Sequence, residues 1–314
     1  MSIAFIFPGQ GSQAVGMGAA LAEAYPAAKA VFSEVDEALG QNLSKLMWEG
    51  PEADLTLTEN AQPALMAVSL AAMRVLSETK GVKLEGSASY VAGHSLGEYS
   101  ALAATGALSL ADTARLLKTR GQAMQQAVPV GEGAMAALLG ADLDQARELA
   151  KAASEGEVCE AANDNAPGQV VISGAKAAIE RAVAMASEYG ARRAVLLPVS
   201  APFHCALMQP AADAMAEALV GVEIKTPVVP VVANVLAEPI TDPEAIGARL
   251  VEQVTGMVRW RETMHFLADN GVSIAYEVGA GRVLTGISRR FDGIDGRSVG
   301  TPDELEAAAA ALAG

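Results

Sequence analysis

The chain has 314 residues, of which 51% are hydrophobic and 19% charged, as in a folded globular protein with a large core rather than a disordered chain. Its net charge of −15 argues against a nucleic-acid partner, because phosphate binding requires a basic surface. The N-terminus lacks the features of a signal peptide, and no stretch predicts a membrane span. Cys159 and Cys205 have neither metal-ligand nor disulfide spacing. The sequence therefore predicts a cytoplasmic protein without a metal site.

The first part of the chain predicts alternating strands and helices. Residues 3–7 form an apolar strand that ends at Pro8 and a glycine-rich loop, and residues 88–93 form a second strand. Helices are predicted over residues 14–39, 59–77, 95–105 and 111–127. This order of elements indicates an α/β domain with a parallel sheet.

A second pattern begins after Pro129. Strands are predicted over residues 134–140, 157–163, 169–174 and 192–200, and helices over residues 142–154 and 175–189. The order strand–helix–strand–strand–helix–strand is ferredoxin-like. We therefore predict a large domain from residues 1–127 and 200–314, with a small domain inserted at 128–199. A terminal helix is expected over residues 301–314.

Residues 93–97 read Gly-His-Ser-Leu-Gly between a predicted strand and a predicted helix. This is the context of a nucleophile elbow, in which two glycines allow the sharp turn that exposes a serine. Ser95 is therefore a candidate nucleophile. The alternative is a packing turn in which Ser95 only caps the following helix.

A serine nucleophile needs a base, and the chain has three histidines. His94 adjoins Ser95, where consecutive side chains usually point apart, and His265 lies on an amphipathic helix that favours a structural role. His204, after the last strand of the small domain, is the best candidate, with a core histidine packed beside Phe203 as the alternative. No Asp or Glu stands out as a third catalytic member, so a backbone carbonyl is an alternative partner for the imidazole.

Arg120 lies on the apolar face of its predicted helix, three residues after Leu117 and four before Met124. Burying an unpaired guanidinium is costly, so Arg120 is expected either to pair with an internal carboxylate or to bind an anionic ligand. Beside a serine nucleophile the second interpretation is attractive, because the planar guanidinium can bind a carboxylate through two hydrogen bonds.

The segment FPGQGSQ, residues 7–13, partly matches a dinucleotide-binding loop, so an NAD-binding oxidoreductase is an alternative class. Pro8 and the lack of a suitable acidic residue about twenty positions on disfavour that alternative. The backbone N–H groups of such a loop can instead donate to an oxyanion, together with the N–H of Leu96 after the serine.

Six segments occur in an order that is similar to one known family: FPGQGSQ, GHSLGE, TRGQAM, NAPGQVVISG, PFHCALM and YEVGAGRVLTG. Together they resemble the malonyl-CoA:acyl carrier protein transacylases of fatty-acid synthesis and the acyltransferase domains of polyketide synthases. The resemblance covers nearly the whole chain. It implies an α/β-hydrolase-like large domain that carries an inserted ferredoxin-like small domain.

The resemblance also implies roles for individual residues. Ser95 takes the malonyl group as an ester, His204 acts as general base and then acid, and Arg120 binds the malonyl carboxylate. The backbone N–H groups of Gln10 and Leu96 form the oxyanion hole.

Further roles concern the surroundings of the serine. The backbone carbonyl of Gln253 is expected to orient His204. Asn163 and His94 are expected to line the pocket, and Phe203 to narrow it against branched acyl chains.

The resemblance implies a two-step transfer of malonyl from malonyl-CoA to the phosphopantetheine thiol of acyl carrier protein, by a monomer without a permanently bound cofactor. A serine esterase or thioesterase, with water as acceptor, is the alternative. Carrier proteins are acidic, as is this chain, so the partner requires a local basic patch. Its candidates are Arg115, Lys118, Arg192 and Arg193.

Overall fold

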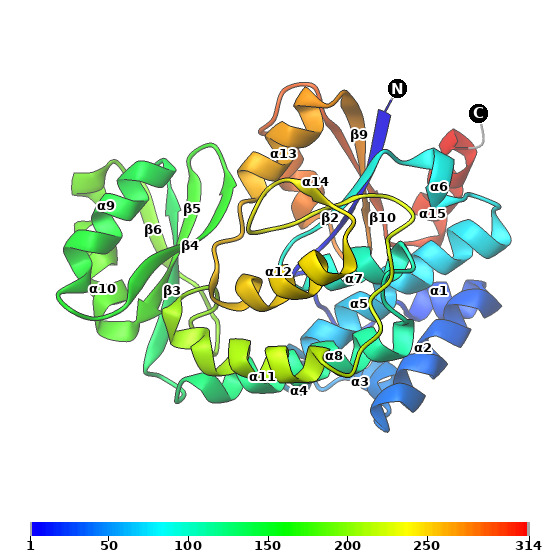
Figure 1. Ribbon diagram of the computed structural model, residues 1–314, viewed down its shortest axis with the longest axis horizontal. Coiled ribbons are helices and arrows are strands. Elements are labelled where there is room, and N and C mark those ends of the chain that lie inside the picture. The colour runs from blue at the N-terminus through cyan, green and yellow to red at the C-terminus, as the bar shows by residue number, and fades with distance from the viewer. Residues whose placement is uncertain (1, 313–314) are drawn as a thin grey trace.

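The computed structural model describes residues 2–312 and contains two β-sheets with helices packed against them (Figure 1). The larger sheet has six strands in the order β10-β9-β1-β2-β7-β8, and the smaller has four in the order β4-β5-β3-β6. Their bounds are β1 (Ser2–Phe7), β2 (Tyr90–Gly93), β3 (Gly133–Leu139), β4 (Cys159–Ala166), β5 (Gln169–Ala175), β6 (Arg193–Leu196), β7 (Val231–Val232), β8 (Pro239–Ile240), β9 (Val272–Val278) and β10 (Asp295–Val299). The predicted α/β class is confirmed.

The helices before the small sheet are α1 (Ala19–Ala24), α2 (Pro26–Leu39), α3 (Leu43–Glu49), α4 (Glu52–Thr56), α5 (Thr58–Arg74), α6 (Leu84–Ser87), α7 (Leu96–Ala104) and α8 (Leu110–Ala127). Two helices, α9 (Leu143–Ser154) and α10 (Lys176–Met185), lie within its sequence. The later helices are α11 (Gln209–Leu219), α12 (Pro243–Thr255), α13 (Trp260–Asp269), α14 (Val283–Ser288) and α15 (Pro302–Leu312). Short helical turns complete the chain at η1 (Val75–Thr79), η2 (Ala186–Tyr189) and η3 (Ala206–Met208).

Strand β1 lies inside the large sheet and is buried on both faces. Phe5 and Phe7 belong to the core on the side of α5, whereas Ala4 and Ile6 belong to a second core beneath α13 and α14. A continuous apolar run is typical of a parallel strand covered by helices on both sides. Strands β1 and β2 are parallel, with Phe7 opposite Gly93, so the loops that follow both strands emerge at the same edge. This edge positions the glycine-rich loop beside the predicted elbow.

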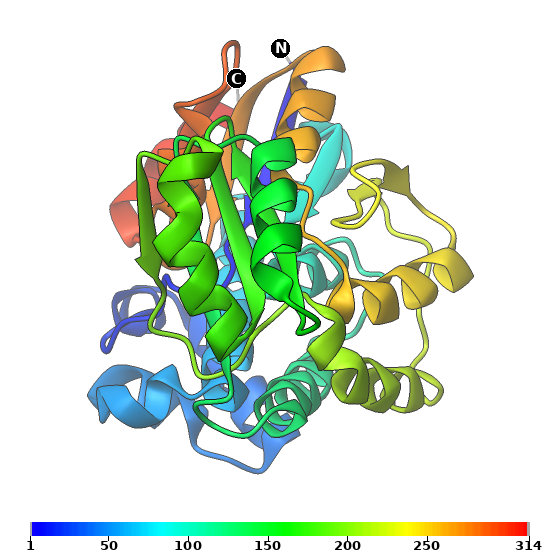
Figure 2. The ribbon, with the colours of Figure 1, turned by 90° about the vertical axis from the view of Figure 1, so that its left-hand side faces the viewer.

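The small sheet is antiparallel and forms the left-hand part of Figure 1. Helices α9 and α10 cover one of its faces, as Figure 2 shows from that side. Residues such as Met135 and Val171 belong instead to the main core, on the side of the large sheet. The predicted order of strands and helices therefore matches the structure.

Several predicted boundaries are wrong for identifiable reasons. The helix predicted over 14–39 begins only at Ala19 and breaks at Pro26, because Gly16 and Gly18 have positive φ angles and proline lacks an N–H donor. Helices α3 and α4 are too short to give a periodic signal and were not predicted. The predicted strand over 192–200 shortens to β6, and the terminal helix is α15, with residues 313–314 outside the described part. Within residues 2–312, no helix is long and apolar enough to cross a membrane.

Candidate active site

Ser95 lies on a sharp turn between β2 and α7, with φ of 53° and ψ of −113°. A non-glycine residue with these angles is strained, and such strain is typical of functional turns. A Cβ atom at Gly93 would lie 1.9 Å from the carbonyl oxygen of Gly97, and one at Gly97 would lie 2.3 Å from the carbonyl oxygen of Phe7. Both glycines are therefore required by close backbone contacts, which a simple packing turn does not need.

Asn234, after β7, holds the turn in place. Its Oδ1 accepts a hydrogen bond from the N–H of Ser95 at 2.7 Å, and its Nδ2 donates to the carbonyl oxygen of Gly93 at 2.6 Å. Asn234 is buried and lies 139 residues after the serine. Sequence reasoning did not identify it, since a single Asn after a short strand carries no distinctive signal.

His204 meets the serine directly. Its Nε2 lies 2.8 Å from Ser95 Oγ, while its Nδ1 lies 2.9 Å from the carbonyl oxygen of Gln253 and 3.2 Å from that of Gly256. Because a carbonyl only accepts, Nδ1 carries the proton and Nε2 is free to accept the serine proton. Burial and the charge of Arg120 lower the pKa of His204 to about 3, so the imidazole is neutral at neutral pH. A neutral imidazole is the form required of a general base.

Arg120 is buried against the serine, with 1% of its surface exposed. Its Nη2 donates to Ser95 Oγ at 3.1 Å and to Gln253 Oε1 at 2.8 Å, and its Nη1 donates to Gln62 Oε1 at 2.8 Å. Within residues 2–312, no carboxylate pairs directly with this guanidinium, and its buried Nε has no acceptor. Of the two alternatives for Arg120, the direct ion pair is therefore not formed, and the guanidinium faces neutral groups and the serine.

Helix α8 approaches the start of α5 closely enough to bring this arginine inside. A Cβ atom at Gly121 would lie 2.5 Å from the Cα of Glu59, so only glycine allows the contact. The aromatic ring of Tyr99 lies 5.6 Å from the Arg120 guanidinium carbon. Burial lowers the pKa of Arg120, and its charge persists through neutral pH because a guanidinium is intrinsically very basic.

Gln10 and Leu96 lie on the two loops that leave the carboxyl edge of the sheet. Leu96 is the first residue of α7, where backbone N–H groups have no acceptor inside the helix. Gln10 follows β1, and its side chain lies 3.4 Å from Thr58 Oγ1. In the described chain, neither backbone N–H donates to a protein acceptor, so both are available to an oxyanion. Gly9 lets this loop approach the elbow, since a Cβ there would lie 2.8 Å from the carbonyl oxygen of His94.

The remaining predicted pocket residues differ in position. His94 contacts Asn165 and Trp260: its Nε2 lies 2.8 Å from Asn165 Oδ1, and its ring centroid lies 5.5 Å from that of Trp260. Asn163 is buried, and its backbone forms an isolated β-bridge with Val258. The β4 side chain that contacts His94 is that of Asn165. Phe203 is buried in the main core immediately before His204. The structure thus brings Ser95, His204 and Arg120 into contact, whereas it shows no contact of His94, Asn163 or Phe203 with the serine.

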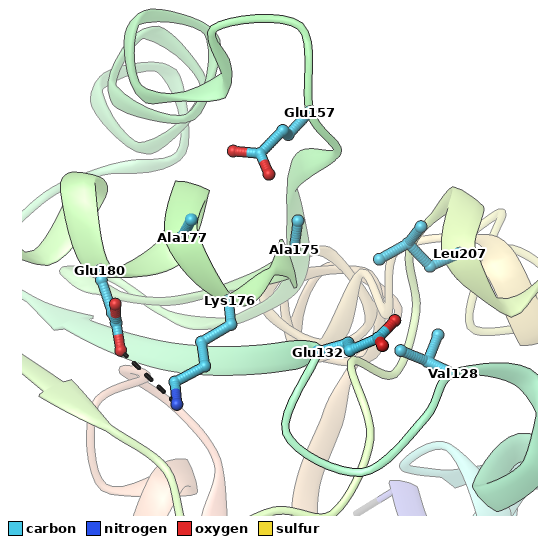
Figure 3. Close-up of a pocket in the computed structure, with 8 residues that line it drawn as sticks. All are labelled: Val128, Glu132, Glu157, Ala175, Lys176, Ala177, Glu180 and Leu207. Carbon is cyan, nitrogen blue, oxygen red and sulfur yellow. Dashed lines mark ion pairs between the residues drawn. The ribbon is translucent and has the colours of Figure 1, made fainter.

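A separate hollow of about 590 Å³ lies beside the small sheet and contains none of these residues (Figure 3). Three glutamates and one lysine are among its lining residues, and Lys176 Nζ lies 4.0 Å from Glu180 Oε1 (Figure 3). The remaining lining residues are Val128, Glu132, Glu157, Ala175, Ala177 and Leu207. Its acidic lining does not suit an anionic acyl donor.

The fold and the geometry around Ser95 define an acyl-transfer class, in which a serine activated by histidine carries an acyl group. The chain belongs to the acyl transferase domain family, which it matches over residues 4–291. It is 46% identical to the malonyl CoA-acyl carrier protein transacylase of Bacillus subtilis, over 98% of this chain and 96% of that protein. It is also 46% identical to the enzyme of the same name from Escherichia coli K12, over 98% of both chains.

Solved structures agree with this assignment. An acyl-carrier-protein S-malonyltransferase from Bartonella henselae has a TM-score of 0.97 and 56% identity, with all of both chains covered. A malonyl-transacylase in complex with its type II PKS acyl-carrier protein has a TM-score of 0.95 and 43% identity, covering 99% of this chain and 100% of that one.

Proposed function

We propose that this protein transfers malonyl groups from malonyl-CoA to the phosphopantetheine thiol of acyl carrier protein, in fatty-acid synthesis. One observation carries the proposal: Ser95 Oγ contacts both His204 Nε2 and Arg120 Nη2, at 2.8 and 3.1 Å. The base and a buried cation therefore both contact the oxygen atom of the nucleophile. This arrangement suits an acyl group that bears its own carboxylate. The names of the relatives support the same assignment.

In the first step, Ser95 Oγ attacks the thioester carbonyl carbon while its proton passes to His204 Nε2. The negative oxygen is held by the N–H groups of Gln10 and Leu96, and each such donor contributes roughly 10²–10³ in rate. The carbon–sulfur bond then breaks, and the sulfur takes the proton from His204. The products are malonyl-Ser95 and free CoA.

In the second step, the thiol of the carrier's phosphopantetheine gives its proton to His204 and attacks the ester carbonyl. The carbon–oxygen bond breaks, and Ser95 Oγ takes the proton back. The carbonyl of Gln253 keeps Nδ1 of His204 protonated in both steps, so Nε2 alternates between base and acid. Arg120 binds the malonyl carboxylate throughout through its guanidinium.

A hydrolase would use the same serine and histidine with water as the acceptor. If its substrate were an uncharged ester, the buried Arg120 would have no role, since a neutral acyl group gains nothing from a guanidinium. An NAD-dependent oxidoreductase would instead use the glycine-rich loop for a pyrophosphate. Gly9 of that loop packs against the carbonyl of His94, which favours the acyltransferase.

The fold and its division form part of the proposal. We describe the large sheet unit as α/β-hydrolase-like, from residues 1–127 and 200–314. The small unit, residues 128–199, is described as an inserted ferredoxin-like domain. The antiparallel order β4-β5-β3-β6, with α9 and α10 on one face, supports this description.

The partner, location and oligomeric state are also proposed. The enzyme is proposed to be a cytoplasmic monomer that holds no permanent cofactor. Because its net charge is negative, acyl carrier protein is proposed to dock on a local group of basic residues. Arg115 and Lys118 form ion pairs with Asp112 and Glu59 respectively, which reduces their suitability. The adjacent residues 192 and 193, both arginines, lack an ion-pair partner in the described chain and are the stronger candidates.

The test is the intact mass of the protein after brief exposure to malonyl-CoA, with Ser95→Ala as control. A gain equal to one malonyl group on the wild type alone, removed by added holo carrier protein, is the expected result. Steady release of CoA and malonate without carrier protein would instead indicate the hydrolase. No adduct and no CoA release would contradict both.

A further inference from the structure

Glu98 is a buried carboxylate beneath the elbow, three residues after Ser95 in the first turn of α7. Only 1% of its surface is exposed. Its Oε2 accepts hydrogen bonds from Gln253 Nε2 at 2.7 Å and from the N–H of Asn234 at 3.1 Å. Across residues 2–312, no lysine or arginine pairs with it directly. A buried carboxylate held only by amides is costly, so its position requires an explanation.

Gln253 connects this carboxylate to Arg120. The side-chain Nε2 of Gln253 donates to Glu98 and also to the carbonyl oxygen of Ser95 at 3.0 Å, while its Oε1 accepts from Arg120 Nη2 at 2.8 Å. An ionised carboxylate only accepts hydrogen bonds, and a guanidinium only donates them. The amide therefore fits in one orientation, with its NH₂ group toward Glu98 and its oxygen toward Arg120. The reversed amide would place donor against donor at Arg120 and acceptor against acceptor at Glu98.

We propose that Glu98 is a positioning residue that acts through Gln253 to hold Arg120 where it binds the substrate carboxylate. This inference rests on the function proposed above. The main-chain carbonyl of Gln253, rather than its side chain, contacts His204. Loss of the Glu98 charge therefore impairs the carboxylate clamp and leaves the serine–histidine pair in place.

The protonation of Glu98 provides a second, independent consequence. Burial raises the pKa of Glu98 to about 7, while hydrogen bonds from Gln253 and Asn234 and the charge of Arg120 act in the opposite direction. The groups around it are Arg120 on α8, Tyr99 on its own helix, and neutral amides after β7 and on α12. Burial raises the pKa of Tyr99 to about 12, so this phenol stays neutral. A protonated Glu98 accepts hydrogen bonds more weakly and can donate to the oxygen of the reversed amide, so it no longer helps to fix the orientation of Gln253.

The experiment compares Glu98→Gln with Glu277→Gln as a matched control. Glu277 is also fully buried, and it accepts hydrogen bonds from the N–H groups of Leu284 and Thr285 at the start of α14. Rates of acylation by malonyl-CoA and by acetyl-CoA are measured in single turnovers from pH 6 to 8, and divided by the active-site concentration. The readout is the ratio of malonyl to acetyl rates, in which effects on folding or on His204 cancel.

We expect Glu98→Gln to lower this ratio by roughly tenfold at pH 8, the effect of about one lost charge-assisted hydrogen bond. Wild type should show a ratio that rises through about pH 7, whereas the variant should show a flat profile. Glu277→Gln should retain the wild-type ratio and profile. Gln253→Leu should match Glu98→Gln, with no further loss in the double variant, because both changes break the same connection.

An unchanged ratio in Glu98→Gln at pH 8 would overturn the proposal, as would an equal decrease in Glu277→Gln. If Glu98→Gln does not fold, the wild-type profile and Gln253→Leu decide: a flat wild-type ratio or an unchanged ratio in Gln253→Leu refutes the role of Glu98. If wild type forms no malonyl ester at all, the proposed function fails instead, so the two failures are distinguishable.

Discussion

Replacing Arg120 with methionine tests the link between the buried cation and the choice of acyl group. The guanidinium can offer two charge-assisted hydrogen bonds to a carboxylate, each contributing about 1.5–3 kcal/mol. Their sum of about 3–6 kcal/mol corresponds to a loss of roughly 10²–10⁴ in the rate of acylation by malonyl-CoA. Acetyl-CoA has no carboxylate, so its rate should change by less than about tenfold.

The same substitution has opposing effects on stability. It leaves Gln62 Oε1 and Gln253 Oε1 without their donor, at about 1–3 kcal/mol each, but it removes a buried cation whose desolvation costs several kcal/mol. We therefore expect the melting temperature to change by no more than about 5 °C. Arg115→Met, an exposed residue on the same helix, is the matched control.

Single-turnover release of CoA from each donor measures both rates, and scanning calorimetry measures the stability. An equal decrease in malonyl and acetyl rates would refute the reasoning and assign Arg120 a structural role. So would a large loss in the Arg115→Met control, because it would show that the rate depends on the integrity of α8 alone.

Four further outcomes are expected from the geometry. The pKa of His204 lies at about 3, below its ordinary value of about 6.5, so the rate of acylation by acetyl-CoA should stay flat from about pH 8 to 5, and an inflection near 6.5 would contradict it. Because of the same pKa shift, the free energy of unfolding should fall as the pH drops from about 6.5 toward 3, since over this range His204 binds a proton in the unfolded chain but not in the folded protein. Calorimetry across this range, with His204→Gln for comparison, checks the sign of this change. Gly97→Ala places a Cβ 2.3 Å from the carbonyl oxygen of Phe7 and should abolish formation of the acyl ester by mass spectrometry, whereas Gly286→Ala, with no atom within 4 Å of its Cβ, should retain it. Phe203→Ala should raise turnover of methylmalonyl-CoA relative to malonyl-CoA by widening the pocket, and an unchanged ratio of kcat/KM values would remove Phe203 from the specificity determinants.

Within residues 2–312 no carboxylate pairs with Arg120, and this suits the proposed preference for a charged acyl group. A carboxylate next to Arg120 would neutralise it before the substrate arrives, and binding would then have to break that pair. The structure instead places Glu98 one amide away, so its charge acts on the guanidinium while the donor groups face neutral acceptors and the serine. The charge of Arg120 also lowers the pKa of His204. A substrate carboxylate bound to Arg120 would offset this charge and so raise the pKa of His204 when the histidine has to accept the serine proton.

Features that depend on local chemistry could be predicted from the sequence. The apolar run of β1, the two glycines around Ser95 and the inward face of Arg120 each follow from spacing over fewer than ten residues. Backbone sterics and helical period act over that range, so these predictions needed no tertiary information. Position along the chain made His204 the best candidate base, and the similarity of six short motifs to one family then supported that choice.

The neutral polar residues that complete the site could be identified only from the three-dimensional structure. Gln62, Asn234 and the side chain of Gln253 lie far from Ser95 in sequence, and nothing in their local patterns separates them from ordinary packing amides. On β4, register shifts between Ala161 and Asn163 and between Asp164 and Ala166 interrupt the regular pairing, and Asn165 rather than Asn163 contacts His94. Such contacts depend on how strands and helices meet in space, because a hydrogen bond is defined by distance and direction rather than by residue type.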